Sequence, residues 1–162
     1  MRFLPAVLLA LFLGSATAAR AGNIEVVRVW PSYRTAVSFD RIALYFNGPE
    51  DTRGESFLRS RPASRDGYYF LVRLDNPGAA VAGATFEINV VSPASPEPRA
   101  FSFKADVPAG SHAFDLGLTG PDWPGAKADA VAWRVVVRSP DGTELASRQS
   151  FLWDRPASTP AR

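Results

Sequence analysis

Apolar and polar residues alternate along several short stretches of the chain, and segments rich in Pro and Gly separate these stretches. The alternation is clearest in residues 68–74 and 84–91, where every second residue is apolar. Successive side chains of a β-strand point to opposite faces of a sheet, so each stretch predicts a strand with one face toward a core. Similar patterns predict further strands near residues 24–30, 99–105, 112–118, 130–138 and 144–153.

One segment, residues 35–46, departs from this alternation. Its apolar residues recur with the spacing of an amphipathic helix, at Phe39, Ile42, Ala43 and Phe46. Asn47-Gly48-Pro49 would end such a helix. The alternative is a strand with Ile42, Leu44 and Phe46 on one face. The pattern favours the short helix.

Short strands joined by Pro/Gly turns are typical of a β-sandwich. The pattern over residues 24–153 resembles an Ig-like antiparallel sandwich of about seven strands, with one short helix inserted after the first strand. We expect strands near 24–30, 68–75 and 112–118 to share one sheet, and strands near 84–91, 130–138 and 144–153 to form the other. The strand near 99–105 could join either sheet. Trp133 has the inward phase and is the candidate core tryptophan.

Residues 1–21 have the features of a cleavable secretory signal peptide. An apolar run of 12 residues, Phe3 to Gly14, follows Met1-Arg2 and is too short to cross a bilayer, which needs about 17–25 residues. Ala19-Arg20-Ala21 fits the cleavage rule and places the cut before Gly22. We therefore expect an exported protein, periplasmic or extracellular, with one sandwich domain over 22–153 and a flexible tail over 154–162.

Composition excludes several kinds of function. The chain has no Cys and one His, which excludes a disulfide scaffold, a zinc site built on Cys and a site with several His ligands. It has 18 Lys and Arg against 16 Asp and Glu, and loss of Arg2 and Arg20 with the signal leaves 16 against 16. A net charge of zero gives no support to nucleic-acid binding. We expect no metal, no cofactor and no nucleic-acid partner.

No catalytic constellation is visible in the chain. His112 has Ser111 beside it, but neighbours on a strand point to opposite faces and cannot pair. The chain lacks a G-x-S-x-G elbow and a P-loop. Most acidic residues fall in turns, although sequence alone cannot place them relative to a cleft. We therefore expect no catalytic residues, and a hydrolase stays only a third hypothesis.

Five residues are candidate contacts for a ligand or partner: Trp123, Trp30, Tyr33, Arg59 and Arg61. The aromatic residues lie at strand ends or in loops, where they could stack on sugars, anchor a protein partner or plug the ends of the sandwich. Trp123 is the best candidate for exposure, because prolines and a glycine restrict its loop. Arg59 and Arg61 lie in an arginine-rich segment that suits an acidic partner, although a solvated loop is the simpler interpretation.

These observations favour an exported, non-catalytic module that binds a protein in the cell envelope or outside the cell. The alternative is a carbohydrate-binding module that uses its loop aromatics. Fold resemblance does not decide between them.

Overall fold

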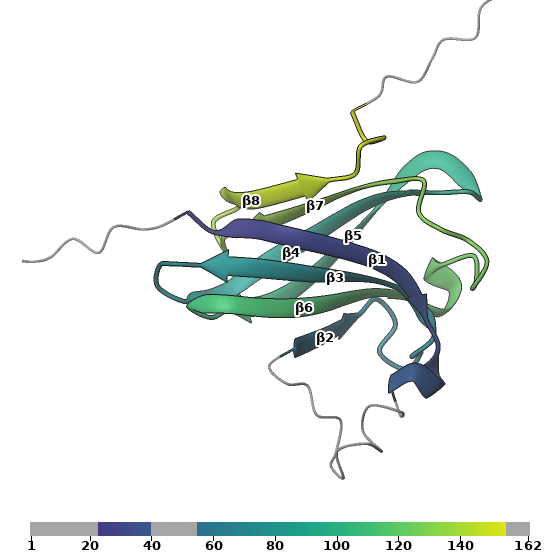
Figure 1. Cartoon of the computed structure of the whole chain (residues 1–162), viewed down its shortest axis with the longest axis horizontal. Coiled ribbons are helices and arrows are strands. Elements are labelled where there is room, and N and C mark those ends of the chain that lie inside the picture. Colours follow the sequence, from purple (N-terminus) through teal and green to yellow (C-terminus); the bar gives the residue numbers. More distant parts are fainter. Residues whose placement is uncertain (1–22, 40–54, 155–162) are drawn as a thin grey trace, which may run out of the picture.

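Eight strands form a β-sandwich in the computed structural model, which describes residues 23–39 and 55–154 (Figure 1). One sheet has the order β1 (Glu25–Arg34), β3 (Gly67–Asn76), β6 (Gly110–Thr119) and β2 (Glu55–Arg59). The other has the order β5 (Ser95–Val107), β4 (Val81–Ser92), β7 (Ala132–Arg138) and β8 (Glu144–Gln149). The predicted membership of both sheets is confirmed, and the strand near 99–105 belongs to the second sheet, beside β4.

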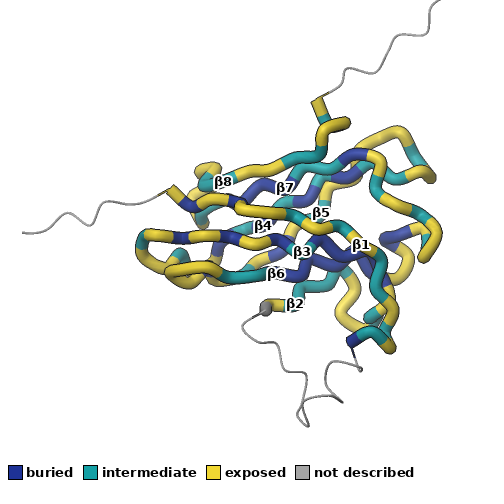
Figure 2. The backbone as a smooth tube through the Cα atoms, viewed as in Figure 1, coloured by how far each residue is buried: buried dark blue, intermediate teal, exposed yellow. Residues whose placement is uncertain are grey.

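The core lies between the two sheets, where the apolar side chains of the alternating segments meet. Figure 2 shows the buried residues along the central strands of the sandwich. Phe70, Phe86 and Leu116 are fully buried there. Trp133 packs against this core with its ring 6.0 Å from that of Phe70, so its inward phase is confirmed. It is only half-buried, because it lies near the start of β7 at one end of the sandwich.

Two expected strand breaks are absent, and prolines cause both errors. β1 continues through Pro31, which pairs with Phe70. The expected break over residues 92–98 is only a tight turn, since β5 begins at Ser95 and contains Pro96 and Pro98. A proline lacks the N–H of the ladder, yet an edge strand tolerates it where the nitrogen faces away from the neighbouring strand. Both β1 and β5 are edge strands.

A short helix over residues 36–39 follows β1, as predicted, although Phe39 is the one described member of the four apolar residues whose spacing suggested it. The rest of the predicted helical segment lies outside the described residues, as do the predicted signal peptide and residues 155–162 of the tail. Sequence analysis missed β2, which pairs in parallel with β6 within the segment interpreted as a solvated loop. Its five residues, Glu-Ser-Phe-Leu-Arg, do not alternate between apolar and polar.

Candidate functional site

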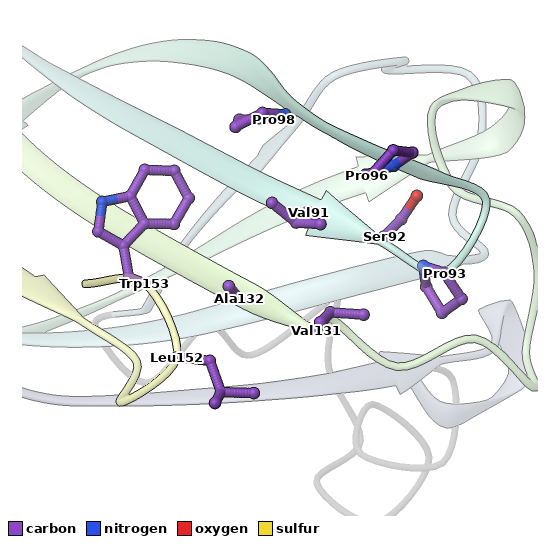
Figure 3. A pocket seen from close by; sticks show the side chains of 9 residues that line it. All are labelled: Val91, Ser92, Pro93, Pro96, Pro98, Val131, Ala132, Leu152 and Trp153. Atoms are coloured by element: carbon purple, nitrogen blue, oxygen red, sulfur yellow. The ribbon is translucent and has the colours of Figure 1, made fainter. Parts of the chain in front are cut away.

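An apolar hollow of about 600 Å³ lies on the outer face of the β5-β4-β7-β8 sheet, beside the turn that joins β4 to β5 (Figure 3). We call it the Trp153 hollow, after the aromatic side chain at one side of it. Its nine lining residues come from β4 and its turn, from β5, from the start of β7 and from the segment after β8. They are Val91, Ser92, Pro93, Pro96, Pro98, Val131, Ala132, Leu152 and Trp153.

The floor of the Trp153 hollow follows from strand alternation. Val91 pairs with Ala132 across β4 and β7. Their neighbours Val90 and Trp133 face the core, so Val91 and Ala132 point to the outer face of the same sheet. Strand alternation normally places polar side chains on the outer face of a sheet. At Val91 and Ala132 this outer face is apolar instead.

The wall that carries Trp153 is held by Ser150. The Ser150 N–H donates to the carbonyl oxygen of Trp133 at 2.8 Å, and the Ser150 hydroxyl accepts from the Trp133 N–H at 2.9 Å. A turn follows, in which the Trp153 N–H donates to the Ser150 carbonyl at 3.1 Å. These bonds fix Leu152 and Trp153 beside the sheet, with Leu152 44% exposed.

The side chains that line this hollow carry no group for proton transfer. None of the nine lining side chains is ionisable, and the Ser92 hydroxyl and the Trp153 indole N–H are their polar groups. General acid–base catalysis needs a group that can carry a proton to the reacting atoms, and the lining offers none near neutral pH. The hollow suits an apolar side chain or ring.

A second hollow of about 370 Å³ adjoins the first at Pro93. The loop before β7 supplies its other lining residues, Pro124, Gly125, Ala126, Lys127 and Ala128. Because Pro93 lines both hollows, they form neighbouring depressions at one end of the sandwich.

The structure does not place Trp123 at the surface, and the expectation that it is exposed is wrong. Its side chain is 5% exposed and stacks on Tyr68 with ring centroids 4.2 Å apart. Its indole N–H donates to the Ala128 carbonyl at 2.9 Å. The indole therefore lies in the end of the core, where it acts as a plug.

The other two aromatic candidates differ from each other. Tyr33 is half-buried and packs against the core, opposite Tyr68 in the β1–β3 pairing. Trp30 is 40% exposed on β1, and the Arg28 guanidinium lies 4.8 Å from the centre of its ring. Trp30 is thus the exposed one of the three aromatic candidates, but it is not part of the Trp153 hollow.

Arg59 belongs to a packed cluster on the outer face of the β1-β3-β6-β2 sheet, under the short helix. Its Nε donates to the Tyr69 hydroxyl at 2.9 Å, and that hydroxyl donates to the Arg65 carbonyl at 2.8 Å. The Phe39 side chain covers this cluster and is 2% exposed. Burial raises the pKa of Tyr69 above its usual value, so its phenol stays protonated at neutral pH. The interpretation of this segment as a solvated loop is therefore wrong at Arg59.

Arg61 joins the two sheets through a buried carboxylate. Its Nε donates to Asp122 at 2.9 Å, and Arg99 of β5 donates to the other Asp122 oxygen at 3.3 Å. Burial raises the pKa of Asp122, but hydrogen bonds from Arg61 and Ser60 outweigh that effect and hold it below its usual value. Asp122 is 7% exposed, whereas the Arg61 side chain that pairs with it is 58% exposed.

The side chains of His112 and Asp115 lie apart, on opposite faces of β6. His112 is half-buried, and its Nε2 lies 2.9 Å from the Ala109 carbonyl oxygen. Asp115 lies on the opposite face of β6, where it is 1% exposed and accepts from Arg34 at 3.3 Å. Within residues 23–39 and 55–154, no three His, Asp or Glu side chains are grouped so that they could hold a metal ion.

Comparison with protein-family models, curated proteins and solved structures finds no match. In the described ranges, no helix combines the length and the apolar character needed to cross a bilayer.

The Trp153 hollow was not predicted from sequence, because residues 92–98 were interpreted as a break between strands. The available signal was the three prolines at 93, 96 and 98, which leave a surface with few polar side chains.

Proposed function

We propose that this protein is an exported, non-catalytic β-sandwich module that binds a protein partner in the cell envelope or outside the cell. The Trp153 hollow is the site that we assign to the partner. The single observation that carries this proposal is the lining itself, which is apolar, contains a tryptophan and has no ionisable side chain.

The lining favours a protein over a sugar. A sugar offers hydroxyl groups around its rings, and a binding site needs polar side chains to satisfy them as well as an aromatic platform. Here Ser92 and the indole N–H are the polar groups available. An apolar side chain of a protein makes no such demand, and a Trp in a pocket is a frequent energetic centre of protein interfaces.

Export rests on the sequence of residues 1–21. A short basic start, an apolar run of 12 residues and a small-residue cleavage site are the three parts of a secretory signal. A partner met after export would be an envelope or secreted protein.

The test is capture of the partner by crosslinking from the native envelope fraction, with protein purified after export. Trp153→Ala and Leu152→Glu change the hollow without entering the core. Trp30→Ala is the matched control, since it removes an exposed tryptophan from the other sheet. We expect one protein band whose capture falls roughly tenfold or more in the two hollow variants and is unchanged in the control.

A panel of soluble polysaccharides, titrated while tryptophan fluorescence is followed, distinguishes the alternative. Saturable quenching that disappears in Trp153→Ala would identify a carbohydrate-binding module instead. Capture that is equal in all variants would refute the assignment of the hollow.

A further inference from the structure

Three of the four edge strands of this sandwich carry features that discourage pairing with another chain. β2 has five residues and β8 has six, and very short edges make poor templates. At the start of the β1 edge, the Arg148 guanidinium of β8 donates to the carbonyl oxygens of Val26 and Val27, and Pro31 in the middle of β1 has no N–H to offer. A register shift between Val26 and Arg28 also bends β1 there.

The fourth edge, that of β5, is long and regular. β5 spans 13 residues, and its pairing with β4 runs without a shift from Arg99 to Ala105. Within the described residues, no strand pairs with its other edge. Pro96 and Pro98 restrict pairing before Arg99, because they have no N–H to offer.

The prolines also indicate which main-chain groups face outward. A proline in an edge strand loses no ladder bond if its nitrogen faces away from the neighbouring strand. Main-chain groups alternate in direction along a strand, so the phase set by Pro98 also turns the N–H and C=O of Ala100, Ser102 and Lys104 away from β4. These three residues are exposed.

We propose that two copies of this chain associate through their β5 edges, in antiparallel register about a two-fold axis at Ser102. Ser102 is the midpoint of the regular segment from Arg99 to Ala105. In this register Ser102 lies opposite Ser102 of the other copy, and Ala100 lies opposite Lys104 of the other copy. Each opposed pair of outward-facing residues exchanges two N–H···O=C bonds. The result is one continuous sheet across both copies.

The side chains of β5 are complementary to themselves in this register. Phe101 comes to lie opposite Phe103 of the other copy, and both side chains belong to or pack against the core face. The long side chains of Arg99 and Lys104 each lie opposite an alanine, so no like charges are opposed. A two-fold axis at Lys104 would oppose two ammonium groups, which destabilises a sheet pair. A second copy therefore fits this edge without a charge conflict.

The first experiment measures mass. Analytical ultracentrifugation of the exported protein over a range of concentrations should give a species of twice the monomer mass. Ser102→Pro removes the N–H at the axis and should make the protein monomeric, whereas Ser102→Ala keeps that N–H and should leave the dimer intact. Thermal unfolding of both variants checks that they fold.

The second experiment tests the register and does not depend on the proline variant. The chain has no cysteine, so a single introduced thiol can form a disulfide only with the same residue of the other copy. Opposed residues of a hydrogen-bonded pair have Cα atoms about 5.5 Å apart, which a disulfide can span. Ser102→Cys should therefore form a disulfide-linked dimer on mild oxidation, and Ala100→Cys should not.

A monomer at all concentrations would overturn the proposal. So would crosslinking of Ala100→Cys as fast as Ser102→Cys, because that result excludes the axis at Ser102. Binding of a foreign strand, detected as a partner lost in Ser102→Pro while the protein alone stays monomeric, would also overturn it. These outcomes are independent of the Trp153 hollow, because the hollow variants leave residues 99–105 unchanged.

Discussion

Replacement of Gly117 by alanine tests the packing of the outer face of the β1-β3-β6-β2 sheet. Gly117 lies opposite Tyr69 in the β3–β6 pairing. A Cβ atom at Gly117 would lie 2.5 Å from Cε1 and 2.8 Å from Cζ of the Tyr69 ring. The ring has little freedom to move, because its hydroxyl is bonded to Arg59 and to the Arg65 carbonyl and the side chain is 1% exposed.

The expected cost follows from these contacts. Overpacking a well-filled site costs roughly 1–3 kcal/mol. A displaced ring also weakens two hydrogen bonds of the hydroxyl, each worth about 1 kcal/mol. We therefore expect Gly117→Ala to lower the free energy of unfolding by about 3 kcal/mol. For a domain of this size that corresponds to a fall in Tm of roughly 10 °C.

Urea unfolding followed by tryptophan fluorescence measures this loss, and a double-mutant cycle assigns it to the ring. In a Tyr69→Leu background, the added methyl group meets no ring, so Gly117→Ala should cost less than about 1 kcal/mol. Gly117 does not have a positive φ, so left-handed backbone strain does not contribute to its loss. A loss below about 1 kcal/mol for Gly117→Ala, or an equal loss in both backgrounds, would refute the clash.

Three further predictions concern the core, the buried ion pair and export. Trp133→Ala should lower the free energy of unfolding by about 2–3 kcal/mol, which is below the range for a fully buried Trp because this side chain is half-exposed. A loss under about 1 kcal/mol in urea unfolding would contradict the packing of Trp133 against the core. Asp122→Asn should flatten the dependence of stability on pH. A carboxyl whose pKa is lowered by folding stabilises the protein above its unfolded pKa of about 3.9, and this stabilisation is lost as the pH falls through the folded pKa. Unfolding of the wild type and the variant from pH 6 to pH 2 measures this difference, and identical curves would contradict the prediction. N-terminal sequencing of exported protein should begin at Gly22, and an intact Met1 on the exported protein would exclude cleavage there.

The alternation of apolar residues was enough to predict the central strands. β4 is buried at every second position from Ala84 to Val90, and so is β3 from Tyr68 to Asn76, because one face of each meets the other sheet; in β3, Gly67 and Tyr69 are buried in addition. The hairpin between β7 and β8 was equally predictable, since Pro140-Asp141-Gly142 requires a tight turn and Gly142 has the positive φ of such a turn. Where a strand has one wet face and a standard turn, local sequence determines its position.

The errors occur where contacts that are distant in sequence decide the outcome. Pro31 does not end β1 because that strand has a neighbour on one side only. Trp123 lies in a restricted loop, and sequence could not tell that Tyr68 would offer a ring to stack on. β2 is a strand because β6 lies beside it in parallel. None of these features leaves a local pattern.

The outer faces of the two sheets differ, and this difference is why we assign binding to only one of them. β6 carries Asp115 and Gly117 on its outer face, which looked like the wet face of a strand, yet both are buried. Phe39 and Tyr69 cover that face, and Arg34 compensates the buried charge of Asp115. Around β6 this face is covered by the chain's own side chains and has little apolar surface to offer to a partner, although Trp30 stays 40% exposed on β1. The Trp153 hollow on the other sheet holds apolar side chains that remain accessible, so a partner that fills it would remove apolar surface from water, which favours association.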